Sequence, residues 1–138
     1  MSSTVQYQFL PGPVGEMLRS ASIATTATVP LTGTLVVTTG HVGLNLETGE
    51  FVTGSIEDEF NAIFNCLDAA LKNAGVSKGL GGAHKLLACF LRAEDEATLH
   101  AIFRKRYPGH TPTWTSVVVA GIMNPGMNAE VQAEAIAR

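Results

Sequence analysis

Charged residues are scarce in this sequence of 138 residues. Asp, Glu, Lys and Arg make up 15% of it, hydrophobic residues make up 46%, and the net charge is −3. The nine Lys and Arg residues are scattered along the chain, whereas a nucleic-acid interface needs a concentrated basic patch. We therefore expect no nucleic-acid partner. A small domain with so few charges is typical of an oligomer that buries part of its surface.

Cysteine is also rare, and long apolar runs are absent. Cys66 and Cys89 both lie in short apolar segments, which favours two buried thiols over a thiol nucleophile or a disulfide. No apolar stretch approaches the roughly 20 residues that a membrane span needs. No charged segment leads into an apolar one as in a secretory signal. We expect a cytoplasmic protein with no membrane partner.

Spacings typical of metal or phosphate sites are missing too. The histidines lie at positions 41, 84, 100 and 110, with no H-x-x-E-H or C-x-x-C pattern, so we expect no metal site. The glycine-rich segment 79–84 lacks the lysine and the spacing of a phosphate-binding loop. We interpret it as a flexible turn, and we expect no cofactor.

The clearest local signal is a helix that begins after Ser55. This serine can cap the helix, and Asp58 lies at the reciprocal capping position. Apolar residues then recur at helical spacing as far as Ala74, and Gly75 is suited to end the helix. The rest of the pattern predicts strands at 5–10, 34–40, 84–91 and 113–123, a helix at 94–107, and a loop with one short strand near 22–29 in the segment 11–33. The tail 129–138 is ambiguous, and local propensity favours a helix there.

Several segments, taken in order, resemble those of one family. "TLVVTTGHVGLNLETGEF" is similar to a strand ending in Ser-Gly-Gln followed by a Thr-Gly turn, and "FNCLDAALKNAGVS" to a helix ending in Ala-Gly. "TPTWTSVVVAGI" is similar to Pro-Ala-Arg-Ser/Thr-x-Val-x-Val, and "VQAEAIA" to Val-Glu-Ile-Glu-Ala-Ile-Ala. The ordered set resembles the Rid family, the reactive intermediate deaminases also called the YjgF family, over about residues 33–137.

This resemblance implies an α+β fold like that of chorismate mutase, with a sheet backed by two helices. It also implies a homotrimer with small-molecule pockets at the subunit interfaces. We therefore expect one Rid-like domain over residues 1–138, with an N-terminal insertion at about 14–32. The tail corresponds to a strand in the family, so the resemblance overrules the local helical propensity.

The resemblance implies a reaction as well. Rid proteins hydrolyse imines and enamines that come from amino acids, with an arginine that binds the substrate carboxylate and a glutamate that positions or activates water. Glu134 falls on the glutamate, with an exposed strand glutamate as the alternative. Trp114 replaces the arginine, and its indole has one N–H donor and no positive charge. This chain therefore lacks the carboxylate-binding group at that position.

Five further residues fall on positions near the family's pocket. His100 lies where the family often has an asparagine, and it could act as an acid or base beside Glu134. Thr39 and His41 replace the ends of Ser-Gly-Gln, and Thr115 and Ser116 follow the tryptophan. Each has a structural alternative, such as a core hydroxyl or a histidine on a helix flank.

Three hypotheses about function remain open at this point. In the first, Glu134 provides acid–base chemistry and Trp114 a stacking wall, for an imine, an enamine or a related intermediate other than those that amino acids give. In the second, the trimer only binds or senses a small ligand. In the third, Trp114 fills the cleft of a structural protein. Val14 replaces a pocket tyrosine of the family, and the insertion, with Met17 and Leu18, could cover the pocket.

Overall fold

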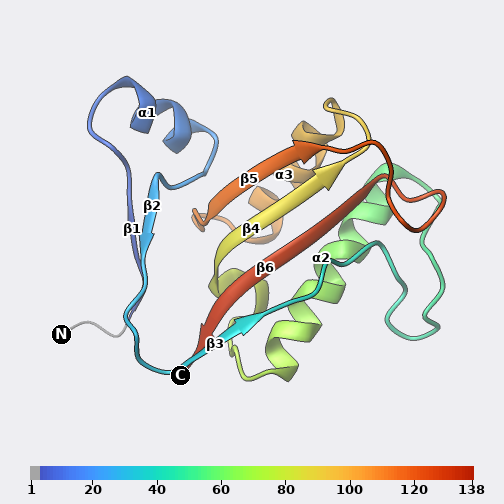
Figure 1. The fold of residues 1–138 in the computed structure, drawn as a ribbon, viewed down its shortest axis with the longest axis horizontal. Coiled ribbons are helices and arrows are strands. Elements are labelled where there is room, and N and C mark those ends of the chain that lie inside the picture. Colours follow the sequence, from blue (N-terminus) through green and yellow to red (C-terminus); the bar gives the residue numbers. More distant parts are fainter. Residues whose placement is uncertain (1–3) are drawn as a thin grey trace.

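A four-stranded sheet with two helices on one face forms the main body of the protein (Figure 1). The computed structural model describes residues 4–138. The strands are β3 (Thr34–Val37), β4 (Ala83–Phe90), β5 (Thr113–Val118) and β6 (Ala129–Ala137), in the order β3-β6-β4-β5. The pair β4–β5 is parallel, and β6 runs antiparallel to both of its neighbours. The α+β fold and the sheet backed by two helices are thus confirmed.

The helices α2 (Ile56–Asn73) and α3 (Asp95–Arg106) agree with the sequence signals. At the start of α2, the backbone N–H of Asp58 donates a hydrogen bond to the Ser55 hydroxyl at 3.0 Å. This bond satisfies one of the N–H groups that a helix start leaves without a partner. Just after α2, Gly75 adopts a φ of 100°, which a residue with a side chain rarely tolerates.

The core lies between these helices and the sheet. The apolar face of α2 contributes five residues with no exposed surface: Phe60, Ile63, Phe64, Leu67 and Leu71. They pack with the buried residues of β4 and β6 and with Leu99 and Phe103 of α3. Removing this much apolar surface from water is the main source of stability in a domain of this size.

The N-terminal segment differs from the prediction. Its strands β1 (Gln6–Gln8) and β2 (Thr26–Thr28) pair with each other, apart from the main sheet, and the helix α1 (Pro13–Ser20) lies between them. We expected a loop here with one short strand, so the absence of a helix from the prediction was wrong. Pro13 begins α1 at a position where its missing N–H costs nothing.

Two other local predictions were corrected. The segment 79–82 forms a 3₁₀ helix, η1 (Gly79–Gly82), instead of a flexible turn. The tail is the strand β6, as the resemblance implied and against local helical propensity. Hydrogen bonds to β3 on one side and to β4 on the other give the tail its strand conformation.

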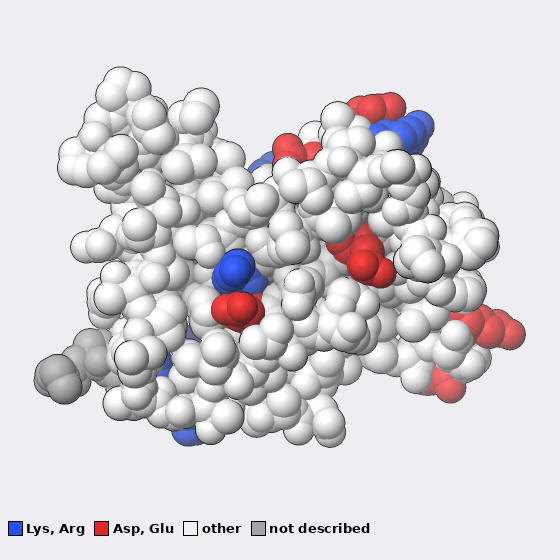
Figure 2. Space-filling view, viewed as in Figure 1, with Lys and Arg blue, Asp and Glu red and all other residues white. Residues whose placement is uncertain are grey.

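The sheet face opposite the helices has no helix over it in the described part of the chain (Figure 1). We call it the open face. Leu35 and Val37 of β3 and Val117 of β5 are 56%, 50% and 40% exposed there. Figure 2 shows that charged side chains are sparse on the surface seen from this side. Across residues 4–138, no helix is long and apolar enough to cross a membrane.

Candidate functional site

Strand β6 carries Glu134 on the open face. The alternate residues Ala129, Val131, Ala133 and Ala135 are buried against the helices. Because side chains alternate along a strand, Glu134 points to the other side, where its side chain is 28% exposed. A carboxylate in this position is partly shielded from water and still accessible to a small molecule.

An irregularity in strand pairing places His84 beside Glu134. Ala83 pairs with Ala135 and Lys85 pairs with Glu134, so β4 has one extra residue between these two pairs. Such a β-bulge changes the direction in which a side chain points. Here the His84 Nε2 lies 3.4 Å from the Glu134 Oε2.

His84 is itself buried, with 6% of its surface exposed. The Thr113 hydroxyl donates a hydrogen bond to the His84 carbonyl at 2.8 Å and links the bulge to β5. The ring nitrogen Nδ1 is buried and has no hydrogen-bond partner among residues 4–138. An unsatisfied buried nitrogen is uncommon and is suited to accept a bond from a ligand or a water molecule.

The surroundings keep His84 neutral near pH 7. Burial lowers the pKa of its imidazole below the ordinary value of 6.5, while the hydrogen bond and the charge of Glu134 act in the opposite direction, and Lys85 lowers the pKa further. A neutral imidazole with its proton on Nε2 donates to the Glu134 carboxylate. The pair can therefore orient a carboxylate and hold or transfer a proton.

Trp114 and His100 lie on the other face of the sheet from Glu134. Trp114 pairs in parallel register with the buried Leu86, and it packs partly buried against the core. Its ring centroid lies 4.3 Å from that of His100 and 5.2 Å from that of Phe103 on α3. Within one protomer, the structure thus brings His100 to Trp114 and not to Glu134.

Little space is left around the indole. A cavity of about 10 Å³ lies between Trp114, His100 and the loop that follows α1, which contributes Ser22 and Ile23. This is no more than the volume that one water molecule needs. The indole N–H donates to the Ser116 hydroxyl at 2.9 Å. The loop, and not Met17, covers the ring, since Met17 is 63% exposed.

The other predicted residues are spread over the sheet. Thr115 is exposed, and it is paired with Leu87. Thr39 is exposed after β3, and His41 forms a backbone bridge to Val131, three positions along β6 from Glu134. Burial lowers the pKa of His41, and the charge of Glu130 partly offsets this.

His84 is the residue that sequence analysis missed. It lies at the start of a continuous apolar run, and it gave no signal beyond its residue type. Its position depends on the pairing of β4 with β6. No group of three His, Cys, Asp or Glu side chains within residues 4–138 could hold a metal ion.

Comparison with known proteins gives this arrangement a family. The family model described as endoribonuclease L-PSP matches residues 20–137. The chain belongs to this family. The resemblance to the Rid proteins is confirmed at the same time. The chain is 29% identical over 103 residues to reactive intermediate deaminase A, chloroplastic, of Arabidopsis thaliana. This match covers 75% of the chain and 52% of the relative, so the chain spans about half the length of that protein.

Solved structures of Rid proteins share the fold. A protein of unknown function of the conserved Rid protein family, YyfB from Yersinia pestis, matches with a TM-score of 0.80 and 16% identity over 96% of this chain and 98% of that one. The YjgF gene product of Escherichia coli matches with a TM-score of 0.66 and 22% identity, over 80% and 85% of the two chains. Identities this low support the fold alone.

Proposed function

We propose that this member of the family hydrolyses an imine or enamine of a small organic molecule, with Glu134 as the group that positions and deprotonates water. The observation that carries the proposal is the pair formed by Glu134 and the buried, neutral His84 on the open face. The glutamate position comes from the family resemblance. The histidine beside it is a feature of this chain's own structure.

The chemistry follows from the two side chains. Glu134 accepts a proton as a water oxygen forms a bond to the C=N carbon, and the imine nitrogen gains a proton to give a carbinolamine. Glu134 then returns its proton to that nitrogen, the C–N bond breaks, and a ketone or aldehyde and ammonia result. His84 is a positioning residue in this scheme, because its N–H bond orients the carboxylate.

The open face supports a homotrimer with ligand sites between subunits. Leu35, Val37 and Val117 leave apolar surface in contact with water, and a second copy of the chain would cover it. Thr115 is the predicted hydroxyl that follows on this side of the sheet. We keep Thr39, His41, His100 and Ser116 as predicted residues of a cleft completed by a neighbouring subunit.

The substrate in this proposal differs from the imines of amino acids. Position 114 offers an indole in place of a guanidinium, so it provides no bidentate partner for a carboxylate. A single domain over residues 1–138 with an insertion at about 14–32, and a location in the cytoplasm, belong to the same proposal. Two free cysteines support that location.

A second function is supported by a different observation. The cavity at Trp114 measures only about 10 Å³, which favours a trimer that binds or senses a ligand elsewhere, without catalysis. Turnover distinguishes the two proposals.

The test measures release of ammonia from freshly generated 2-iminobutanoate and 2-iminopropanoate and from an uncharged aromatic ketimine. We expect turnover of the uncharged imine, with loss of at least about a hundredfold in Glu134→Gln. Glu130→Gln is the matched control, because Glu130 lies on the same face of β6, and it should retain activity. Turnover that survives in Glu134→Gln contradicts the mechanism. Absence of turnover with every probe favours the binding function.

A further inference from the structure

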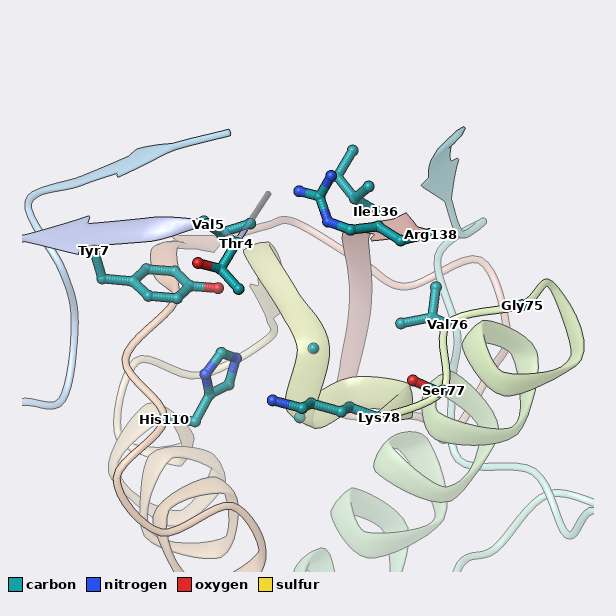
Figure 3. A pocket seen from close by; sticks show the side chains of 12 residues that line it. Thr4, Val5, Tyr7, Gly75, Val76, Ser77, Lys78, His110, Ile136 and Arg138 are labelled. Atoms are coloured by element: carbon teal, nitrogen blue, oxygen red, sulfur yellow. The ribbon is translucent and has the colours of Figure 1, made fainter. Parts of the chain in front are cut away.

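A second cavity lies at the end of the sheet where β4 begins, between the N-terminal strands and the connection from α2 to η1 (Figure 3). Its volume is about 300 Å³, at the lower end of the range for small-molecule sites. The residues that matter for its chemistry are Tyr7, Val76, Lys78, His110, Ile136 and Arg138. Trp114 and Glu134 are not among its lining residues.

Positive charge dominates this cavity. Figure 3 shows the ammonium of Lys78 projecting into it and the guanidinium of Arg138 on the opposite side. Of the twelve described residues that line it, none is Asp or Glu. No carboxylate side chain among residues 4–138 forms an ion pair with Lys78 or Arg138. Two cations therefore face one cavity without a compensating acid.

The guanidinium is held in place before any ligand arrives. One of its terminal nitrogens donates to both the carbonyl and the hydroxyl of Thr32, each at 2.8 Å. This leaves the other donors of Arg138 for a further acceptor. A guanidinium that is already oriented loses less freedom when it binds an anion.

His110 and Tyr7 form a polar wall beside these cations. The His110 Nε2 lies 2.6 Å from the Ala83 carbonyl oxygen, and the Tyr7 hydroxyl donates to the same oxygen at 3.3 Å. Burial lowers the pKa of His110; the bond to Ala83 partly offsets this, and the charge of Lys78 lowers the pKa further. Burial raises the pKa of Tyr7 to about 12, so its hydroxyl stays neutral.

The remaining surface suits an apolar body. Val76 packs against α2 and η1 with little exposure, and Ile136 comes from β6. The rings of Tyr7 and His110 meet edge to face at 5.6 Å. Aliphatic and aromatic walls of this kind accommodate a small hydrocarbon or ring.

We propose that this cavity is a binding site for a small organic anion, in which Lys78 and Arg138 bind a carboxylate or phosphate group and the walls accept an apolar body. The site lies away from position 114, where the family resemblance would place an anion. It does not depend on catalysis by Glu134, since binding alone defines it.

The test is a titration followed by isothermal calorimetry and by NMR of His110, with benzoate and phenyl phosphate as probes. Benzamide, which has the same ring and no charge, is the neutral control. We expect saturable binding of the anions in the millimolar range or tighter and much weaker binding of benzamide. We also expect the pKa of His110 to rise on binding, because the anion offsets the charge of Lys78.

Two variants assign the binding to this cavity. Lys78→Gln should weaken benzoate binding by about tenfold, and the matched control Lys105→Gln, at an exposed lysine of α3, should leave it unchanged. Arg138→Gln should also weaken it. The proposal is overturned if no anion binds saturably, if both lysine variants behave alike, or if benzamide binds as well as benzoate. Inorganic phosphate that binds as tightly as phenyl phosphate would contradict the apolar part of the site.

Discussion

The neutral, buried state of His84 predicts how the stability of the protein depends on pH. Its pKa is lowered in the folded protein from the ordinary value of 6.5, which applies to the unfolded chain. Below pH 6.5 the unfolded chain therefore binds a proton that the folded protein does not. Stability contributed by His84 is complete above pH 6.5 and is lost as pH falls toward the folded pKa.

The magnitude follows from the proton linkage. A group that is protonated only in the unfolded chain lowers the free energy of unfolding by about 1.4 kcal/mol per pH unit. Between pH 7 and pH 5.5 only about one unit lies below 6.5, so His84 contributes a loss of at most about 1 kcal/mol. The hydrogen bond from His84 to Glu134 makes the loss smaller, because it favours the protonated ring.

The assay is urea unfolding at pH 7 and pH 5.5, followed by the fluorescence of Trp114, the only tryptophan in the chain. His84→Gln keeps a polar side chain and cannot take up a proton in this range. The other histidines titrate alike in both proteins, so their effect cancels in the difference. The variant's stability deficit relative to wild type should shrink at pH 5.5. A deficit that is equal at both pH values would refute a neutral His84 in the folded protein.

Three further predictions concern assembly and packing. Val37→Lys should dissociate the proposed oligomer in size-exclusion chromatography, whereas Leu46→Lys, at a loop residue that is 59% exposed, should leave the elution volume unchanged. Gly15→Ala should lower the free energy of unfolding by about 1–3 kcal/mol, because a Cβ would overlap the Leu10 carbonyl; Gly121→Ala, which meets no atom within 4 Å, should cost less than about 0.5 kcal/mol. Ser55→Ala should cost about 1 kcal/mol in urea unfolding, because α2 loses its cap, and an unchanged midpoint would contradict the role of that bond.

Local sequence was sufficient for the two main helices. The cap at Ser55, the apolar spacing through Leu67 and the glycine at 75 all act within a few residues, and α2 formed where they predicted it. The hydrogen bonds of a helix join residues four positions apart. The information for such an element is therefore contained in a short window of the chain.

The tail and the site depended on distant partners. Residues 129–137 have helical propensity, yet they form a strand because β3 and β4 lie on both sides. Lys85 pairs with Glu134 across the sheet, and this register alone makes His84 the extra residue that faces the carboxylate. Nothing near His84 in the sequence indicates the bulge.

Trp114 shows the same division between sequence and structure. The sequence by itself determined that an indole replaces a guanidinium at this position, and so that the positive charge is gone. Only the tertiary structure decided that the ring faces His100 and Phe103 while Glu134 faces the other way. The reason is geometric: the side to which a strand residue points depends on which strands pair with it and on which face the helices cover, and these contacts join parts of the chain that are far apart in sequence.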